Sequence, residues 1–62
     1  MNRPPRWALS RQDWHAHAVD EAADHPYGVW IARCGHRLLM VTGLHEDPPS
    51  QICPTCARWT IR

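Results

Sequence analysis

Three cysteines, arranged as one single residue and one closely spaced pair, constrain the fold more than any other feature. The chain reads Cys34-Gly35-His36, then sixteen residues, then Cys53-Pro54-Thr55-Cys56. Three thiols cannot all pair in disulfides within one chain, whereas two short groups of sulfur and nitrogen ligands are typical of tetrahedral zinc sites. The spacing therefore predicts that a metal ion, rather than a disulfide framework, holds the fold together.

The Cys53-x-x-Cys56 half carries the stronger signal, because two sulfurs three residues apart on a tight turn can both face one ion. Pro54 favours that turn, and amide groups of the turn can donate to the sulfurs. In the other half, the long imidazole side chain of His36 can reach the same ion despite its one-residue spacing. His45, or another of the five histidines, is the alternative fourth ligand. We expect one Zn²⁺ per chain, with iron as the second choice, held by Cys34, His36, Cys53 and Cys56.

The length of the chain limits it to a single domain. At 62 residues it buries too little surface to be comfortably stable, and domains of this size often depend on a metal. Residues 1–12 combine a proline pair with three arginines and are expected to form a flexible basic arm. Residues 13–62 then form the zinc-binding domain, and loss of the metal is expected to unfold residues 28–59.

Composition and charge bear on the cellular location of the protein and on the class of partner that it can bind. No segment is apolar enough for a signal peptide or a membrane span, so we expect a cytoplasmic protein with no membrane partner. All seven basic residues are arginines, which together with many alanines hints at a GC-rich bacterial genome. The formal charge of +1 becomes about zero in the zinc-bound form, because three thiols lose protons and one dication is added. That balance disfavours general, charge-driven nucleic-acid binding.

The clearest secondary-structure signals surround the first ligand pair. Residues 28–33 are rich in β-branched and aromatic side chains and predict a strand. Residues 37–42 predict a second strand, which places Gly35 at the tip of a β-hairpin, where it supplies backbone freedom. Residues 43–52 predict a polar surface loop.

The remaining segments give mixed patterns. Residues 13–18 alternate like a strand but contain alanines that favour a helix, so both structures stay open. Residues 19–24 predict a short helix or a turn. The end of the chain predicts either a strand or one helical turn, and Trp59 and Ile61 favour the strand. Together the segments predict a small, zinc-stabilised, mainly β domain with room for one short helix.

Several of these motifs together resemble small zinc-finger proteins of actinobacteria. The resemblance lies in Cys34-Gly35-His36 and Cys53-Pro54-x-Cys56, preceded by the segment from Trp14 to Asp20 and by His25-Pro26, and it covers about residues 14–57. The site is also similar to those of zinc ribbons and treble-clef fingers, although Cys-x-x-Cys is commoner there than Cys-x-His. The resemblance implies a β-hairpin with zinc knuckles and a role in recognition.

A catalytic role is not expected of this chain. A catalytic zinc keeps an open coordination position beside a general acid or base, whereas four protein ligands are predicted here. The signature of zinc deaminases, His-x-Glu followed by Pro-Cys-x-x-Cys, is absent, because Ile52 precedes Cys53. A chain of this mass also encloses little space for a substrate pocket.

We therefore expect a module that mediates contacts between macromolecules, with an unidentified protein as its partner and a regulatory, accessory role. Trp14, Trp30 and Trp59 cannot all be buried in so small a core, and exposed tryptophans are typical of interface anchors. Of these, Trp30 and Trp59 are the candidates for partner contact beside the metal site.

Two alternative functions follow from other residues. In a nucleic-acid-binding zinc finger, arginines that flank the ligands would contact phosphates while Trp30 or Trp59 stacks on bases. These arginines are Arg33, Arg37, Arg58 and Arg62. A metal sensor or store would use further histidines as a weaker second site, namely His15, His17 and His45.

Overall fold

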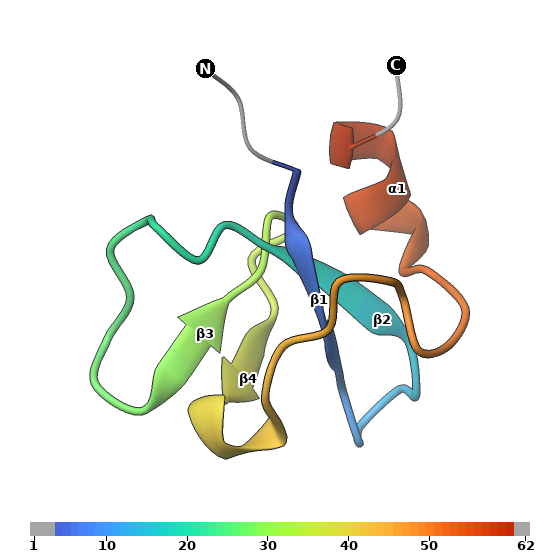
Figure 1. Cartoon of the computed structure of the whole chain (residues 1–62). Helices are drawn as coiled ribbons and strands as arrows, with labels where there is room; N and C mark the ends of the chain where they lie inside the picture. Colours follow the sequence, from blue (N-terminus) through green and yellow to red (C-terminus); the bar gives the residue numbers. More distant parts are fainter. Residues whose placement is uncertain (1–3, 61–62) are drawn as a thin grey trace.

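Two antiparallel β-hairpins and one short α-helix make up the part of the chain that can be described (Figure 1). The computed structural model describes residues 4–60, with side chains as far as Arg58. The mainly β architecture with one short helix agrees with the sequence-based expectation. None of the helices in this described part is long and apolar enough to cross a membrane.

The first hairpin joins β1 (Arg6–Leu9) to β2 (Ala16–Val19), with Trp7 opposite Ala18. β1 is also fixed on its other side, because Trp7 and His45 exchange backbone hydrogen bonds of 2.8 Å in both directions. The flexible arm expected over residues 1–12 is therefore wrong for β1. Extended backbone was the correct local inference, but the extended segment has two hydrogen-bonded neighbours that lie far away in the sequence.

The segment 13–18, for which strand and helix both stayed open, forms a strand from Ala16 onward. Every residue of β2 is buried, so the strand is enclosed on both faces. Burial between neighbouring segments thus outweighs the helix propensity of Ala16 and Ala18. A turn follows, in which the N–H of Ala23 donates to the carbonyl of Asp20 at 3.0 Å, and no helix forms there.

The second hairpin joins β3 (Val29–Ile31) to β4 (Arg37–Leu39), which are shorter than the predicted strands 28–33 and 37–42. β4 gives way to the 3₁₀-helix η1 (Met40–Thr42), where the Thr42 hydroxyl donates to the Leu39 carbonyl. At the tip, Gly35 has φ 91°, a conformation that residues with a Cβ rarely adopt. The predicted hairpin with Cys34-Gly35-His36 at its tip is confirmed.

The chain ends its described part in the helix α1 (Pro54–Thr60), so the preference for a strand there is wrong. Pro54 occupies the first helical position, where its missing N–H costs nothing, and the N–H of Ala57 donates to the Cys53 carbonyl at 2.9 Å. These local start signals outweigh the strand propensity of Trp59. Ile61 lies outside the described residues.

The core is built almost entirely from small side chains. α1 packs on β2, and the second hairpin reaches β2 through the N–H of Arg33, which donates to the Ala18 carbonyl at 2.8 Å. Half-buried Trp7 and Trp30 pack around this centre. The buried apolar residues are Ala8, Ala16, Ala18, Val19, Ala32, Leu38, Cys53 and Cys56.

Candidate metal centre

One imidazole and the three sulfurs of the chain gather where the two hairpins meet α1. The group consists of His17, Cys34, Cys53 and Cys56, whose ligand atoms all lie within 4.8 Å of one another. Nδ1 of His17 is 3.4 Å from the sulfur of Cys34 and 3.8 Å from the sulfur of Cys56. The residues could therefore hold a metal ion together.

These spacings suit tetrahedral coordination. With a zinc–nitrogen distance of about 2.05 Å and a zinc–sulfur distance of about 2.3 Å, a tetrahedral angle separates nitrogen and sulfur by about 3.6 Å. The two measured distances from His17 Nδ1, 3.4 and 3.8 Å, lie on either side of that value. If all four residues bound one ion, their ligand atoms would fill its tetrahedral coordination sphere.

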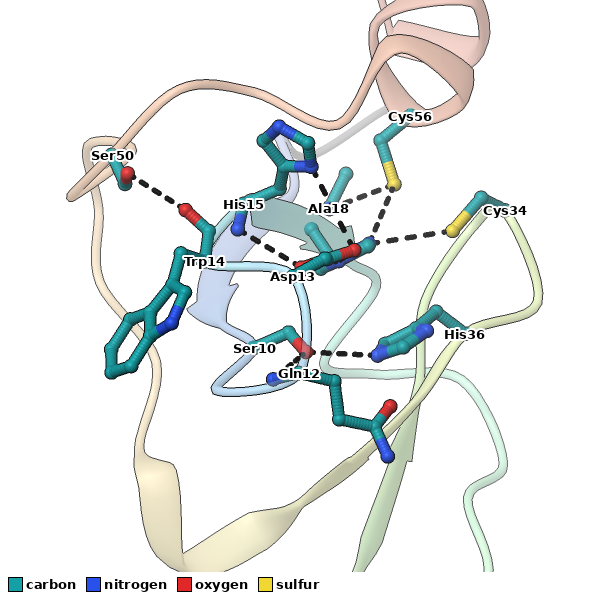
Figure 2. A network of polar contacts seen from close by, with 11 residues as sticks. Ser10, Gln12, Asp13, Trp14, His15, Ala18, Cys34, His36, Ser50 and Cys56 are labelled. Carbon is teal, nitrogen blue, oxygen red and sulfur yellow. Dashed lines mark hydrogen bonds and ion pairs between the residues drawn. The ribbon is translucent and has the colours of Figure 1, made fainter.

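Three elements place the ligands. Cys34 lies at the tip of the β3–β4 hairpin, His17 lies on β2, and the other two cysteines flank the first turn of α1. β2 holds the first turn of α1 directly, because the Cys53 N–H donates to the Ala16 carbonyl at 2.9 Å and the Ala18 N–H donates to the Cys56 sulfur at 3.3 Å. Figure 2 shows the sulfurs of Cys34 and Cys56 turned toward the same point.

The histidine that lies among the sulfurs is not the one predicted as the fourth ligand. The structure brings together the three predicted cysteines but places His17, not His36, among them. His36 turns its Nε2 toward the Ser10 hydroxyl at 3.0 Å and stacks its ring on that of His17. The sequence signal for His17 was present but weak: a histidine between two alanines in an alternating segment, with no nearby cysteine to mark it as a ligand.

The two cysteines of the pair differ in acidity. Burial raises the pKa of the Cys56 thiol to about 12. Burial also raises the pKa of Cys53, but hydrogen bonds from the N–H groups of Cys56 and Thr55 overcome this effect and bring the Cys53 pKa below its ordinary value. A bound cation would supply the positive charge that the buried Cys56 thiolate needs.

Asp13 holds the far side of the His17 ring. Its two carboxylate oxygens lie 3.2 and 3.1 Å from His17 Nε2, so Nδ1 is left to face the sulfurs. Burial lowers the pKa of His17, and although Asp13 opposes this effect, the net pKa lies below 6.5. A neutral imidazole with Nε2–H donated to a carboxylate is the form in which a histidine binds a metal through Nδ1.

A second group of metal-ligand residues shares His17, since the ligand atoms of Asp13, His17 and His36 also lie within 4.8 Å of one another. The two rings are stacked, with centroids 4.3 Å apart and planes inclined by only 10°. The nitrogen lone pairs lie in the ring planes, so two such parallel rings do not converge on one ion. The histidines considered for a weaker second site, His15, His17 and His45, do not form a group among the described residues.

The residues predicted to contact a partner have varied surroundings. Arg33 is held by Asp20 through Nε at 2.9 Å and Nη2 at 2.6 Å, which lowers the pKa of Asp20. Arg37 and Arg58 are exposed, whereas Trp30 is half-buried against the core. Arg62 and the side chain of Trp59 lie outside the described part of the chain.

Comparison with protein-family models, curated proteins and solved structures found no match to this chain.

Proposed function

We propose that this chain is a zinc-stabilised interaction module, with one Zn²⁺ held by His17 and the three cysteines, and that its partner is a protein. Three thiolates and one imidazole are ligands that zinc accepts in closed structural sites.

Native mass spectrometry with and without chelator tests whether the chain binds zinc. One zinc per chain, accompanied by the loss of three thiol protons, is expected; a metal-free protein or a disulfide contradicts the proposal.

The observation that carries the protein-partner part is the outward face of the β3–β4 hairpin. Residues opposite one another in an antiparallel pair share a face, so Val29 lies beside Leu39 and Ile31 beside Arg37. The intervening pair, Trp30 and Leu38, faces the core instead.

The outward face is apolar and open. Leu39 is 62% exposed, and Tyr27 and Val41, which flank the two strands, are more exposed still. Arg37 is the only charged residue on the two strands. Exposed apolar side chains on and beside one hairpin of so small a domain are typical of a protein-binding surface rather than of a phosphate-binding one.

The test is a pair of variants that keep the metal site. We expect Leu39→Ser with Val41→Ser to bind zinc normally and to lose a stoichiometric protein partner in a pull-down from the cells that make the protein. Trp14→Ser, which removes another exposed large side chain from a different loop, is the matched control and should retain the partner. Partner binding that survives the double substitution, or no stoichiometric partner with the unsubstituted protein, contradicts the proposal.

Nucleic-acid binding is the second candidate, supported by the exposure of Arg37 and Arg58. It is weakened by the two-point contact between Arg33 and Asp20, which compensates one of the four flanking charges. Fluorescence anisotropy with short DNA and RNA oligonucleotides decides the matter. Phosphate contacts predict binding that weakens steeply with salt, and an absence of binding at low salt rejects this function.

A further inference from the structure

We infer that His36 is a positioning residue for the metal ligand His17, and that the β1–β2 loop, residues 10–15, sets the orientation of both rings. This inference rests on the metal site of the proposed function. In the Cys34-Gly35-His36 motif, Cys34 would then be a metal ligand and His36 a positioning residue, instead of both being ligands.

The loop supplies a separate contact to each histidine. Ser10, only 4% exposed, lies 3.0 Å from His36 Nε2 through its hydroxyl, and three residues later Asp13 accepts from His17 Nε2. Figure 2 shows Ser10 and Asp13 on the same short loop, with His36 approaching from the second hairpin. One loop therefore holds Nε2 of both rings, that of His36 through Ser10 and that of His17 through Asp13.

The loop itself is tightly held. The Trp14 N–H donates to the Ser10 carbonyl at 2.8 Å, and the Ser50 hydroxyl donates to the Trp14 carbonyl at 2.9 Å. These bonds keep Trp14 at φ 58°, in the left-handed region that a bulky side chain rarely occupies. Asp13 Oδ1 also accepts from the His15 N–H at 3.0 Å, so the carboxylate has little freedom to turn away from His17.

Stacking completes the arrangement. His36 covers one face of the His17 ring at a centroid separation of 4.3 Å. Asp13 fixes one nitrogen of the buried His17 ring, and the parallel His36 ring limits the plane that the His17 ring can adopt. The nitrogen lone pair of Nδ1 then stays directed at the point between the sulfurs.

Cobalt(II) titration of the reduced, metal-free 62-residue chain tests the inference, because tetrahedral cobalt–thiolate sites have visible and near-ultraviolet bands that report the ligand set. Zinc affinity is then measured by competition with a chelator. Loss of a residue that orients a metal ligand typically weakens metal binding by about 10–100-fold. We expect such a loss for His36→Ala, with one cobalt per chain and a tetrahedral spectrum retained.

Two further variants separate orientation from general stability. His36→Phe keeps a ring that can stack but loses the contact with Ser10, so its zinc affinity should lie above that of His36→Ala and close to that of Ser10→Ala. Ser10→Ala should weaken binding, and the double variant with His36→Ala should be no weaker than His36→Ala alone, because the serine acts through that ring. His45→Ala, which removes an exposed histidine, is the matched control and should change nothing.

The opposite results are equally clear. If His36→Ala loses the nitrogen-ligand spectrum while His17→Ala keeps it, His36 is the ligand and the inference fails. If His36→Ala binds zinc as tightly as the unsubstituted protein, the stack has no positioning role, although the proposed metal site stands. If the unsubstituted protein takes up no cobalt or zinc, the proposed site itself fails, and the inference with it.

Discussion

At the scale of single residues, Asp13 has two tasks that a substitution can separate. Its carboxylate accepts from the His15 N–H, which shapes the loop, and from His17 Nε2, which sets the tautomer of the ring. The first task needs only an oxygen acceptor, and an asparagine can provide it. The second task depends also on negative charge, because a carboxylate beside a metal-bound imidazole strengthens its binding to the ion.

Asp13→Asn is therefore expected to keep the fold and to weaken zinc binding by about tenfold to hundredfold. The measurement is a competition titration against a chelator of known affinity. Asp47→Asn, a change at an exposed acidic residue, should leave the affinity as it is. Equal affinity for the Asp13 variant and the unsubstituted protein would show that the carboxylate does not support the ligand.

The lowered pKa of His17 predicts how stability depends on pH. Burial keeps the folded-state pKa below the ordinary value of 6.5, so between these two pKa values the unfolded chain binds a proton that the folded chain does not. The contribution of His17 to stability should therefore be complete above pH 6.5 and be lost as the pH falls through the folded-state pKa below it. Protonation of the released thiolates acts in the same direction.

Urea unfolding of the zinc-loaded protein at a series of pH values measures this dependence. His45→Ala, which removes an exposed histidine, should leave the slope unchanged. A stability that stays constant or rises between about pH 6.5 and pH 5 would contradict a neutral, buried His17.

At the scale of elements, the sequence predicted those strands and turns whose hydrogen-bonding partners are close in the chain. The β3–β4 hairpin was predictable because its strands and its glycine turn are adjacent in the chain. β1 was not, because its partners β2 and His45 lie elsewhere in the sequence. The helix α1 was missed because Pro54 and the Cys53 carbonyl outweighed the strand propensity of Trp59.

The same reasoning explains the candidate site. Cys53 and Cys56 form a local motif, and Cys34 was found because the chain has no other cysteine. His17 is brought beside the sulfurs by the pairing of β1 with β2 and by the contacts of β2 with α1, none of which a spacing rule contains. His36, by contrast, was chosen because it lies only two residues from Cys34, but its ring is engaged by Ser10 and by the ring of His17.

The contact between Asp20 and Arg33 ties the end of β2 to the turn that carries Cys34. Its hydrogen bonds lower the pKa of Asp20, yet the Asp20 side chain is 44% exposed, so solvent screens the pair. We expect Asp20→Asn to lower the free energy of unfolding by about 0.5–1 kcal/mol. Urea unfolding at neutral pH measures the change, and Asp24→Asn, at an exposed position in the same turn region, should have no effect.

At the scale of the whole molecule, we expect the core formed by the described residues to be too small to hold the fold alone. The largest fully buried side chains are those of His17, Val19 and Cys56, two of which are proposed metal ligands. Binding of a structural zinc contributes about 10–16 kcal/mol in small zinc domains, which exceeds what such a core can supply.

Removal of the metal should therefore unfold both hairpins together. This extends the expectation for residues 28–59 to β1 and β2, because His17 links the first hairpin to the site. Chelator treatment, or Cys56→Ser, should collapse the dispersion of amide signals in an NMR spectrum throughout the described residues. A cooperative transition that persists in excess chelator would mean that packing alone maintains the fold.

The distance along the chain between the ligands has a consequence for how fast the molecule folds. His17 lies 17 residues from Cys34 and 39 residues from Cys56. Each hairpin can close in microseconds from neighbouring segments, but bringing these ligands together requires the closure of much longer loops. An ion captured first by Cys53 and Cys56 would then act as a fixed point on which the earlier hairpins dock, so the folding rate should rise with the concentration of free metal.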